Sequence, residues 1–329
     1  MDSKPPTEMA VADTGVNVDG DTDEDVGGFI LYLICQSFKL MTRCMVPDQV
    51  AGDSDHVAGD PDHVAGDSDM RLKHDDGWNI PAGSPFYPSL PAVYRNVRFQ
   101  FVFFHAAPTA VQDFLPEPLQ AAEDGLCVAS GLEVPLCENY GSFEESFIVM
   151  KCHFQDQTGF YCSHVFHNGP AGIAAGREIY GTPKVYAEMK VTRADRSMVT
   201  ETSYGGVPVL RIASSVEAGS PRDGGAGQDG DAAPHDAMPA LTPAWRLKII
   251  PRADGPGPAI KQLIDCTKTA RDVEVHSFAQ GKGTIELDAS PRCDLTPLKP
   301  LEYGDAFHME SSYTEGYARV VYDYLSDGP

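Results

Sequence analysis

One lysine in this chain stands where a reactive amine would be useful. Lys184 follows Pro183 and precedes Val185, in a segment that reads GREIYGTPKVYAEMKV over 176–191. A lysine amine can attack a ketone to form a Schiff base, and the protonated imine then accepts electrons from a breaking bond. Burial in an apolar pocket can supply the free amine, because it lowers a lysine pKa from about 10.4 by about 3 to 5 units. The residues alone leave an alternative open, a lysine whose stem packs on apolar surface while its ammonium reaches water.

Other combinations of reactive side chains are less suited to chemistry. His164 and His167 stand three apart in a predicted strand, so their side chains point to opposite faces and cannot share a metal ion. His276, in VEVHSF, is predicted to be a core or lining residue rather than a catalytic base. Neither the nucleophile motif GxSxG nor a phosphate-binding loop occurs. The lysine therefore remains the candidate for catalysis.

The segments that must position this lysine are mostly predicted strands. Short runs rich in β-branched and aromatic residues occur at 97–104, 146–154, 160–167, 207–213, 245–251 and 318–325. Two short helices are predicted at 108–119 and 170–181. This pattern predicts an α+β, mainly antiparallel β fold, in which a closed barrel or a double sheet encloses a pocket. A Rossmann fold is not expected, because regular strand–helix alternation is missing.

Residues 1–77 are predicted to form an acidic, low-complexity, disordered extension. They contain a seven-residue repeat that begins at Val50, Val57 and Val64, with too few apolar residues for a coiled coil. The apolar run 29–35 is far shorter than the ~20 residues of a membrane-spanning helix. The acidic stretch before that run does not fit a secretory signal.

A second low-complexity stretch, rich in Gly, Ala and Asp, covers 217–241. Strand-like sequence lies on both sides of it, which favours a flexible loop over a boundary between domains. We therefore predict one folded domain over 78–326, interrupted by this loop.

The overall composition restricts the partners and the compartment. Asp and Glu number 48 against 25 Lys and Arg, a net charge of −23, which disfavours nucleic acid or an anionic membrane as the main partner. The eight cysteines include no CxxC pair. They are expected to be reduced, mostly buried thiols of a cytoplasmic protein.

The run NGPAGIAAGREIYGTPK, 168–184, closely resembles the active-site segment of the acetoacetate decarboxylase family, where a Gly-Arg-Glu motif precedes the Schiff-base lysine. The resemblance continues through IPAGSPFYPS, LPEPL, WRLKIIPRADG, DVEVHSF and VVYDYL, from about residue 78 to 326. It implies the family's cone-shaped β-barrel around an apolar cavity. It also implies a lyase that acts on a small keto acid or carbonyl compound, needs no metal or organic cofactor, and assembles into a homo-oligomer.

Matched position by position, the resemblance assigns catalysis to Lys184 and Glu145. Glu145 falls on a glutamate of the family's pocket, and its neighbour Glu144 is the next candidate, for substrate binding. Tyr186, two residues beyond the lysine, is also expected to contact substrate.

The family places an arginine near the start of its first barrel strand, where it meets the substrate carboxylate. Gapless matching puts Val97 at that position, between Arg95 and Arg98. Arg98 is the preferred candidate for the carboxylate-binding group, and Arg95 is the second. Another acidic position of the family's pocket falls near Ala129 and is expected to be missing.

Three neighbours of the lysine are expected to be structural. Arg177 and Glu178 are predicted to form an ion pair that holds the lysine segment, and Pro183 belongs to the same group. One position departs from the family pattern, because Val185 replaces the second lysine with which true acetoacetate decarboxylases help to keep the reactive one neutral.

These observations lead to three hypotheses about function. The preferred one is a decarboxylase of a β-keto acid, acetoacetate-like or larger, in which the imine of Lys184 accepts electrons as carbon dioxide leaves. The alternative is a Schiff-base lyase or aldolase–dehydratase for a larger keto acid, which Val185 and the altered arginine position favour. The third is a binding protein that keeps the barrel without the chemistry.

Overall fold

The architecture depends on one large, strongly curved sheet. The computed structural model describes residues 86–217 and 238–326. The predictions for 1–77, and most of the predicted loop 217–241, lie outside the described residues. The strands are β1 (Ala92–His105), β2 (Gln120–Ala121), β3 (Leu126–Cys137), β4 (Gly141–Phe154), β5 (Gln157–His167), β6 (Lys184–Tyr186), β7 (Glu188–Ala194), β8 (Ser197–Tyr204), β9 (Val207–Val216), β10 (Ala244–Pro251), β11 (Pro258–Asp265), β12 (Ala270–Leu287), β13 (Ala289–Ser290), β14 (Cys293–Asp294), β15 (Glu302–Glu315) and β16 (Arg319–Asp323).

The sheet has fourteen strands, and its main path runs β16-β11-β10-β5-β4-β3-β1-β15-β12-β9-β8-β7. β2 pairs with β4, and β6 pairs with β5. The pairs β5–β6 and β5–β10 are parallel, and the remaining pairs along the path are antiparallel. The predicted mainly antiparallel fold is thus confirmed. The sheet stays open, because β16 and β7 end the path and do not pair with each other among the described strands.

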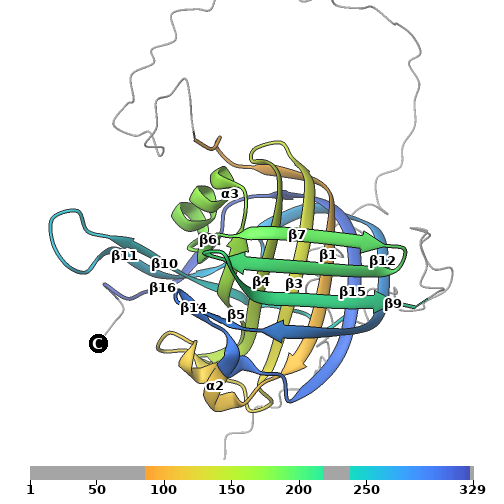
Figure 1. The fold of residues 1–329 in the computed structure, drawn as a ribbon. Coiled ribbons are helices and arrows are strands. Elements are labelled where there is room, and N and C mark those ends of the chain that lie inside the picture. Colours follow the sequence, from red (N-terminus) through yellow and green to blue (C-terminus); the bar gives the residue numbers. More distant parts are fainter. Residues whose placement is uncertain (1–85, 218–237, 327–329) are drawn as a thin grey trace, which may run out of the picture.

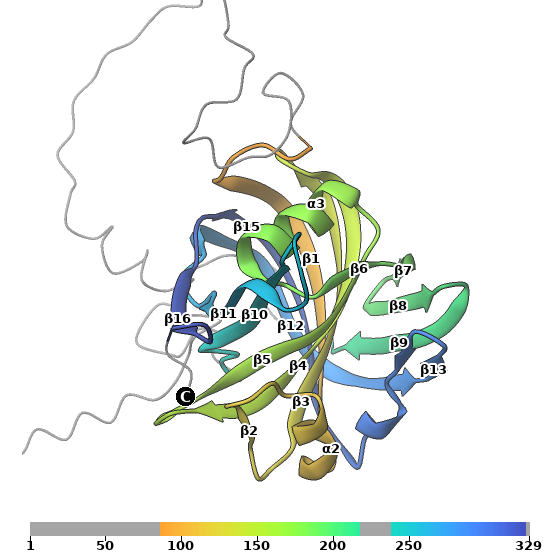
Figure 2. The ribbon, with the colours of Figure 1, turned by 90° about the vertical axis from the view of Figure 1, so that its left-hand side faces the viewer.

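Curvature folds this sheet into layers. β7, β8 and β9 lie across the strands β1, β3 and β4, as Figures 1 and 2 show from two sides. The two layers meet closely at Gly131, where a Cβ atom would lie 2.1 Å from the Thr200 Oγ1 atom. Buried polar pairs cross the same interface, Ser146 with Thr202 at 2.8 Å and Gln100 with Thr200 at 3.1 Å. The predicted double sheet therefore describes the molecule better than the closed barrel.

The opposite face of β1, β3 and β4 is covered by other elements. α3 (Pro170–Ala175) and the strands β10, β11 and β16 lie on that side (Figure 2). α3 continues into a π-helical turn, η2 (Gly176–Tyr180). The space between these elements and the central strands holds the candidate site.

The helices are few and short, as predicted. The expected helix over 108–119 is α2 (Pro108–Asp113), which ends before Pro116. The expected helix over 170–181 is α3 together with η2. A single-turn 3-10 helix, η4 (Thr296–Leu298), completes the set. No helix of the described residues has the length and apolar character to cross a membrane.

A substitution at Gly131 tests whether the two layers approach as closely as the structure shows. We expect Gly131→Ala to destabilise the fold by about 1 to 3 kcal/mol, because the added methyl group must displace Thr200 in a packed interface. The melting temperature should fall by several degrees, at about 2 to 4 °C per kcal/mol for a domain of this size. Gly255→Ala is the matched control, because a Cβ atom at Gly255 meets nothing within 4 Å. Equal melting temperatures for the two variants would contradict the proposed packing.

Candidate active site

A tight turn delivers Lys184 to the sheet. Gly181 has a φ of +69°, and a Cβ atom there would lie 2.4 Å from the backbone of Lys248, so glycine is required for both reasons. The chain then enters β6, which pairs in parallel with β5 and places Lys184 beside Val165. The Arg177 Nη1 atom donates to the Lys184 carbonyl oxygen at 3.1 Å. The turn at Gly181 and the hydrogen bond from Arg177 therefore both fix the position of the Lys184 backbone.

The side chain of Lys184 is nearly enclosed. It is 12% exposed, and its Nζ atom lies 2.8 Å from the Glu145 Oε2 atom. The Phe143 ring centroid is 5.8 Å from the same nitrogen. Gly176 leaves room for the lysine stem, because a Cβ atom there would lie 2.7 Å from the lysine Cδ atom. The structure thus brings the two predicted catalytic residues, Lys184 and Glu145, into direct contact.

A buried histidine lies behind this pair. His167 is fully buried and stacks on Phe143 at 4.2 Å between ring centroids. The Gly169 N–H donates to its Nδ1 atom at 2.8 Å, which assigns the ring hydrogen to Nε2. Burial, and then the charge of Lys184, lower the pKa of His167 to about 2. The ring is therefore neutral, and its Nε2 atom, 3.7 Å from the Glu145 Oε2 atom, presents an N–H dipole rather than a charge.

The lysine opens into a cavity of about 270 Å³. Four charged side chains from four strands line it: Glu145 of β4, Lys184 of β6, Arg246 of β10 and Glu315 of β15. The Arg246 Nε atom is buried and has no hydrogen-bond partner within the described part of the chain. The positive charge of Arg246, at the wall of this cavity, is suited to binding an anionic ligand.

Glu315 lies in a setting that favours its protonated form. Burial raises the pKa of Glu315, against the opposing effects of the nearby Lys184 and Arg246 charges and of a hydrogen bond from Tyr94. The Tyr94 hydroxyl donates to the Glu315 Oε2 atom at 3.0 Å. Glu145 contacts the lysine amine while Glu315 contacts a tyrosine hydroxyl, so the cavity contains two carboxyl groups in different environments. Such a pair can divide acid and base roles.

Tyrosine hydroxyls add neutral donors to the polar wall. Tyr94 stacks on Tyr313 at 4.7 Å, and burial raises the pKa of both phenols well above the ordinary value. The Tyr180 hydroxyl is held by the Gly316 carbonyl oxygen at 2.8 Å. The Tyr140 hydroxyl is buried and without a hydrogen-bond partner among the described residues. Tyr140 and Arg246 both line the cavity.

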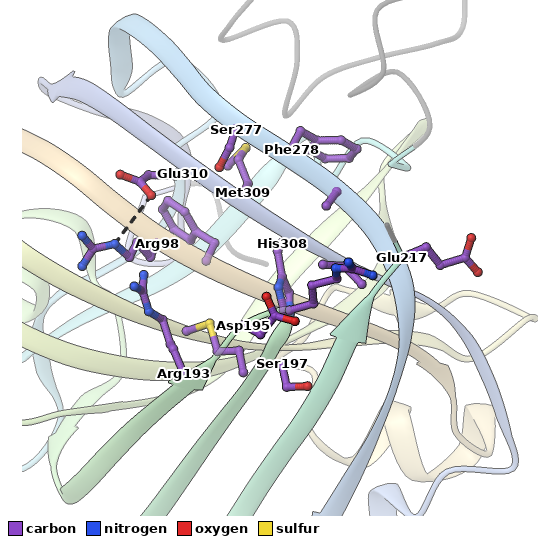
Figure 3. A pocket seen from close by; sticks show the side chains of 15 residues that line it. Arg98, Arg193, Asp195, Ser197, Glu217, Ser277, Phe278, His308, Met309 and Glu310 are labelled. Atoms are coloured by element: carbon purple, nitrogen blue, oxygen red, sulfur yellow. Dashed lines mark ion pairs between the residues drawn. The ribbon is translucent and has the colours of Figure 1, made fainter. Parts of the chain in front are cut away.

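The structure corrects the assignment of Arg98. Its Nη1 atom pairs with Glu133 at 3.2 Å and its Nε atom lies 3.6 Å from Glu310. It lines a separate cavity of about 800 Å³, together with Arg193 and other residues, where Figure 3 shows it beside Glu310. Side chains alternate across β1, so Phe99 faces the lysine cavity and Arg98 faces the other side of the sheet. Arg246, not Arg98, is the arginine of the lysine cavity.

Three other predicted contact residues also lie outside that cavity. Arg95 is exposed and pairs with Glu138 at 3.2 Å. Tyr186 is 62% exposed, at the end of β6. Glu144 accepts a hydrogen bond from the Val191 backbone at 3.0 Å. None of the three residues is part of the lining of the lysine cavity.

The structural residues next to the lysine act differently from the prediction. Within the described residues, Arg177 and Glu178 form no ion pair with each other. Arg177 bonds to the lysine backbone, and Glu178 accepts a hydrogen bond from Tyr87. Pro183 directly precedes β6, as expected for a residue that fixes the backbone there.

Sequence reasoning missed Arg246 and Glu315. Arg246 follows the buried Trp245 in WRLKIIP. Alternation along a strand predicts that these two side chains face opposite sides of the sheet. Glu315 ends β15, a strand that was not predicted. Its place depends on the pairing of β15 with β1, which sequence pattern does not give.

Comparison with known proteins matches the folded part of the chain to one family. The family model for acetoacetate decarboxylase (ADC) matches residues 79–325. Acetoacetate decarboxylase 2 of Mesorhizobium japonicum is 28% identical over 248 residues, covering 75% of this chain and 89% of that protein. The crystal structure of acetoacetate decarboxylase from Legionella pneumophila has a TM-score of 0.65 at 22% identity, covering 77% of this chain and 95% of that one.

A second solved structure with the same fold contains a bound compound. It is the enduracididine biosynthesis enzyme MppR, complexed with the condensation product of pyruvate and imidazole 4-carboxaldehyde. Its TM-score is 0.59 at 19% identity, covering 74% of this chain and 94% of that one. At this identity the likeness establishes the fold alone.

The neutral, buried His167 makes a prediction for stability. Its pKa of about 2 lies below the ordinary value of about 6.5. Between these two pH values the unfolded chain binds a proton on His167 and the folded chain does not. The stability it contributes is present above about pH 6.5 and is lost as the pH falls below that value, by about 1.4 kcal/mol per pH unit. We expect urea unfolding between about pH 6.5 and 5 to show a shallower pH dependence for His167→Gln than for the unchanged chain. Equal slopes would show that the histidine does not titrate in this way.

Proposed function

The chain belongs to the acetoacetate decarboxylase family, and on that basis we propose that this lyase decarboxylates a β-keto acid through a Schiff base on Lys184. The observation that carries the proposal is the contact of 2.8 Å between the Lys184 Nζ and Glu145 Oε2 atoms, inside a cavity that also holds Arg246. An amine, a base and a carboxylate-binding cation are the three groups that this reaction requires.

In the first step the amine attacks the ketone. Glu145 accepts the proton of the lysine ammonium across their contact, which frees the lone pair of Nζ. Nζ forms a bond to the ketone carbon, and the ketone oxygen takes up a proton. Loss of that oxygen as water leaves the iminium ion, with Glu145 positioned to exchange the protons involved.

The carboxylate is then oriented for departure. Arg246 and Tyr140, which both line the cavity, bind its oxygens. The bond between the carboxylate and the adjacent carbon breaks, carbon dioxide leaves, and the electron pair moves into the iminium to give an enamine. The enamine carbon then takes up a proton, for which Glu315 is the proposed donor because burial raises its pKa, and water releases the ketone and restores Lys184.

Val185 supports a second candidate, carbon–carbon bond formation or dehydration through the same imine. The residue that follows Lys184 is a valine, whose side chain packs against the main hydrophobic core. This position therefore carries no ammonium group beside the reactive lysine. MppR, whose solved complex contains a condensation product of pyruvate and an aldehyde, offers a precedent for such chemistry on this fold. Both candidates begin with the same imine and differ in whether carbon dioxide is released.

Borohydride trapping tests the imine directly. With acetoacetate and other keto acids we expect a reduced adduct on Lys184, found by peptide mass mapping, together with carbon dioxide release above the rate in buffer. Lys184→Ala should lose both signals and keep the circular dichroism spectrum of the unchanged chain, although the loss of a buried charge partner lowers its melting temperature. An adduct that retains the carboxylate, formed without carbon dioxide release, would support the second candidate. Absence of any adduct would remove both.

Replacing Arg246 tests the carboxylate-binding role. We expect Arg246→Met to reduce kcat/KM for a β-keto acid by about 10- to 100-fold, mainly through KM, because a charge-assisted hydrogen bond is lost. Arg98→Met, a matched change in the separate cavity, should leave kcat/KM unchanged. Trapping of a neutral ketone on Lys184 checks that the Arg246→Met site remains folded. The reverse outcome, with Arg98→Met impaired and Arg246→Met unaffected, would restore the arginine predicted from sequence.

A further inference from the structure

The cavity around Lys184 has two chemically different ends. Polar side chains gather at one end of the strands, where Tyr94 pairs in register with Tyr313 and Glu315 ends β15. Further along the same strands, Phe99 pairs in register with Met309. Both residues line this cavity, and both also border the larger cavity that contains Arg98. The character of the wall therefore changes from polar to apolar along β1 and β15.

The neighbouring strands repeat this order. On β4, the cavity-lining residues follow in the sequence Phe143, Glu145, Phe147 and Val149, so the catalytic carboxylate is succeeded by two apolar residues. Phe147 and Val149 pack against the cluster that contains Phe101. Leu241 and Val273, which belong to or pack against the same cluster, add further apolar lining.

The apolar end contains a flat aromatic surface. The Phe99 and Phe101 rings are 5.6 Å apart between centroids and nearly parallel, at 9°. The cavity has a volume of about 270 Å³, and a water molecule occupies about 30 Å³ in the liquid. Acetoacetate, whose ketone carbon bears only a methyl group, leaves the apolar end unfilled. An apolar surface of this kind is stabilised when a substrate removes it from water.

The chemistry fixes which part of a substrate reaches that end. The ketone carbon must meet Lys184, and its carboxylate arm is directed to Arg246, whose charge acts on Glu315 of the polar end. The second substituent of the ketone carbon then has the apolar end before it. We propose that the substrate is a β-keto acid whose ketone carbon bears an aromatic-sized apolar group, bound against Phe99, Phe101 and Phe147. This inference rests on the proposed function and names its substrate class.

A comparison of two β-keto acids tests the inference. With the full chain, kcat/KM for benzoylacetate should exceed that for acetoacetate by about tenfold or more, the scale of discrimination by apolar pockets. Rates are measured as carbon dioxide release after subtraction of the Lys184→Ala rate, which removes spontaneous decarboxylation. Val149→Phe and Val273→Phe each fill part of the apolar end and should reduce the ratio of the two kcat/KM values by about tenfold. Two variants are used so that one that fails to fold does not end the test.

Val320→Phe is the matched control, because this valine is half exposed on β16 and does not line the cavity. It should retain the ratio of the unchanged chain. Lys184-dependent decarboxylation that is faster for acetoacetate, or a ratio unaffected by both filling variants, would overturn this inference and leave the proposed function intact. Absence of Lys184-dependent carbon dioxide release from both acids would overturn the proposed function and, with it, this inference.

Discussion

The site depends on one ion pair held largely out of water. Lys184 and Glu145 are 12% and 13% exposed, and their charged atoms are 2.8 Å apart. Breaking a buried pair by removing one partner costs about 3 to 5 kcal/mol, because the other charge is left without compensation. Each residue therefore constrains the strand of the other, and the parallel pairing of β5 with β6 between them fixes their separation. Glycines at 176 and 181 are needed because the backbone must pass close to the lysine stem and to β10.

The surrounding groups keep the pair reactive without adding charge next to it. His167 is neutral because burial and Lys184 lower its pKa to about 2, so it supports Glu145 through a dipole. Arg246 and Glu315, whose pKa is raised by burial, stand on other strands of the cavity. A substrate carboxylate can then enter as the ligand of Arg246 without displacing the ion pair that activates the amine.

The sequence predicted Lys184 and Glu145 but not the arginine and the second carboxyl group of this site. Lys184 and its glycines lie in one short segment, so their arrangement is written in neighbouring residues. The arginine was sought beside Val97, which is fully buried, and strand alternation forces Arg98 to the opposite face. Arg246 reaches the cavity only because β10 joins the sheet beside β5, a long-range pairing that periodicity does not encode.

Val185 affects the electrostatics of Lys184 from the opposite face of β6. Side chains alternate along β6, so Lys184 faces the cavity while Val185 packs against the main core. A cation at position 185 would act on the lysine only through its field across the strand. Valine removes that field and leaves Glu145 as the charged side chain that contacts the amine. The free amine must then arise by proton transfer to a carboxylate rather than by repulsion from a second cation. Such a transfer needs little water and suits a cavity whose far end is apolar.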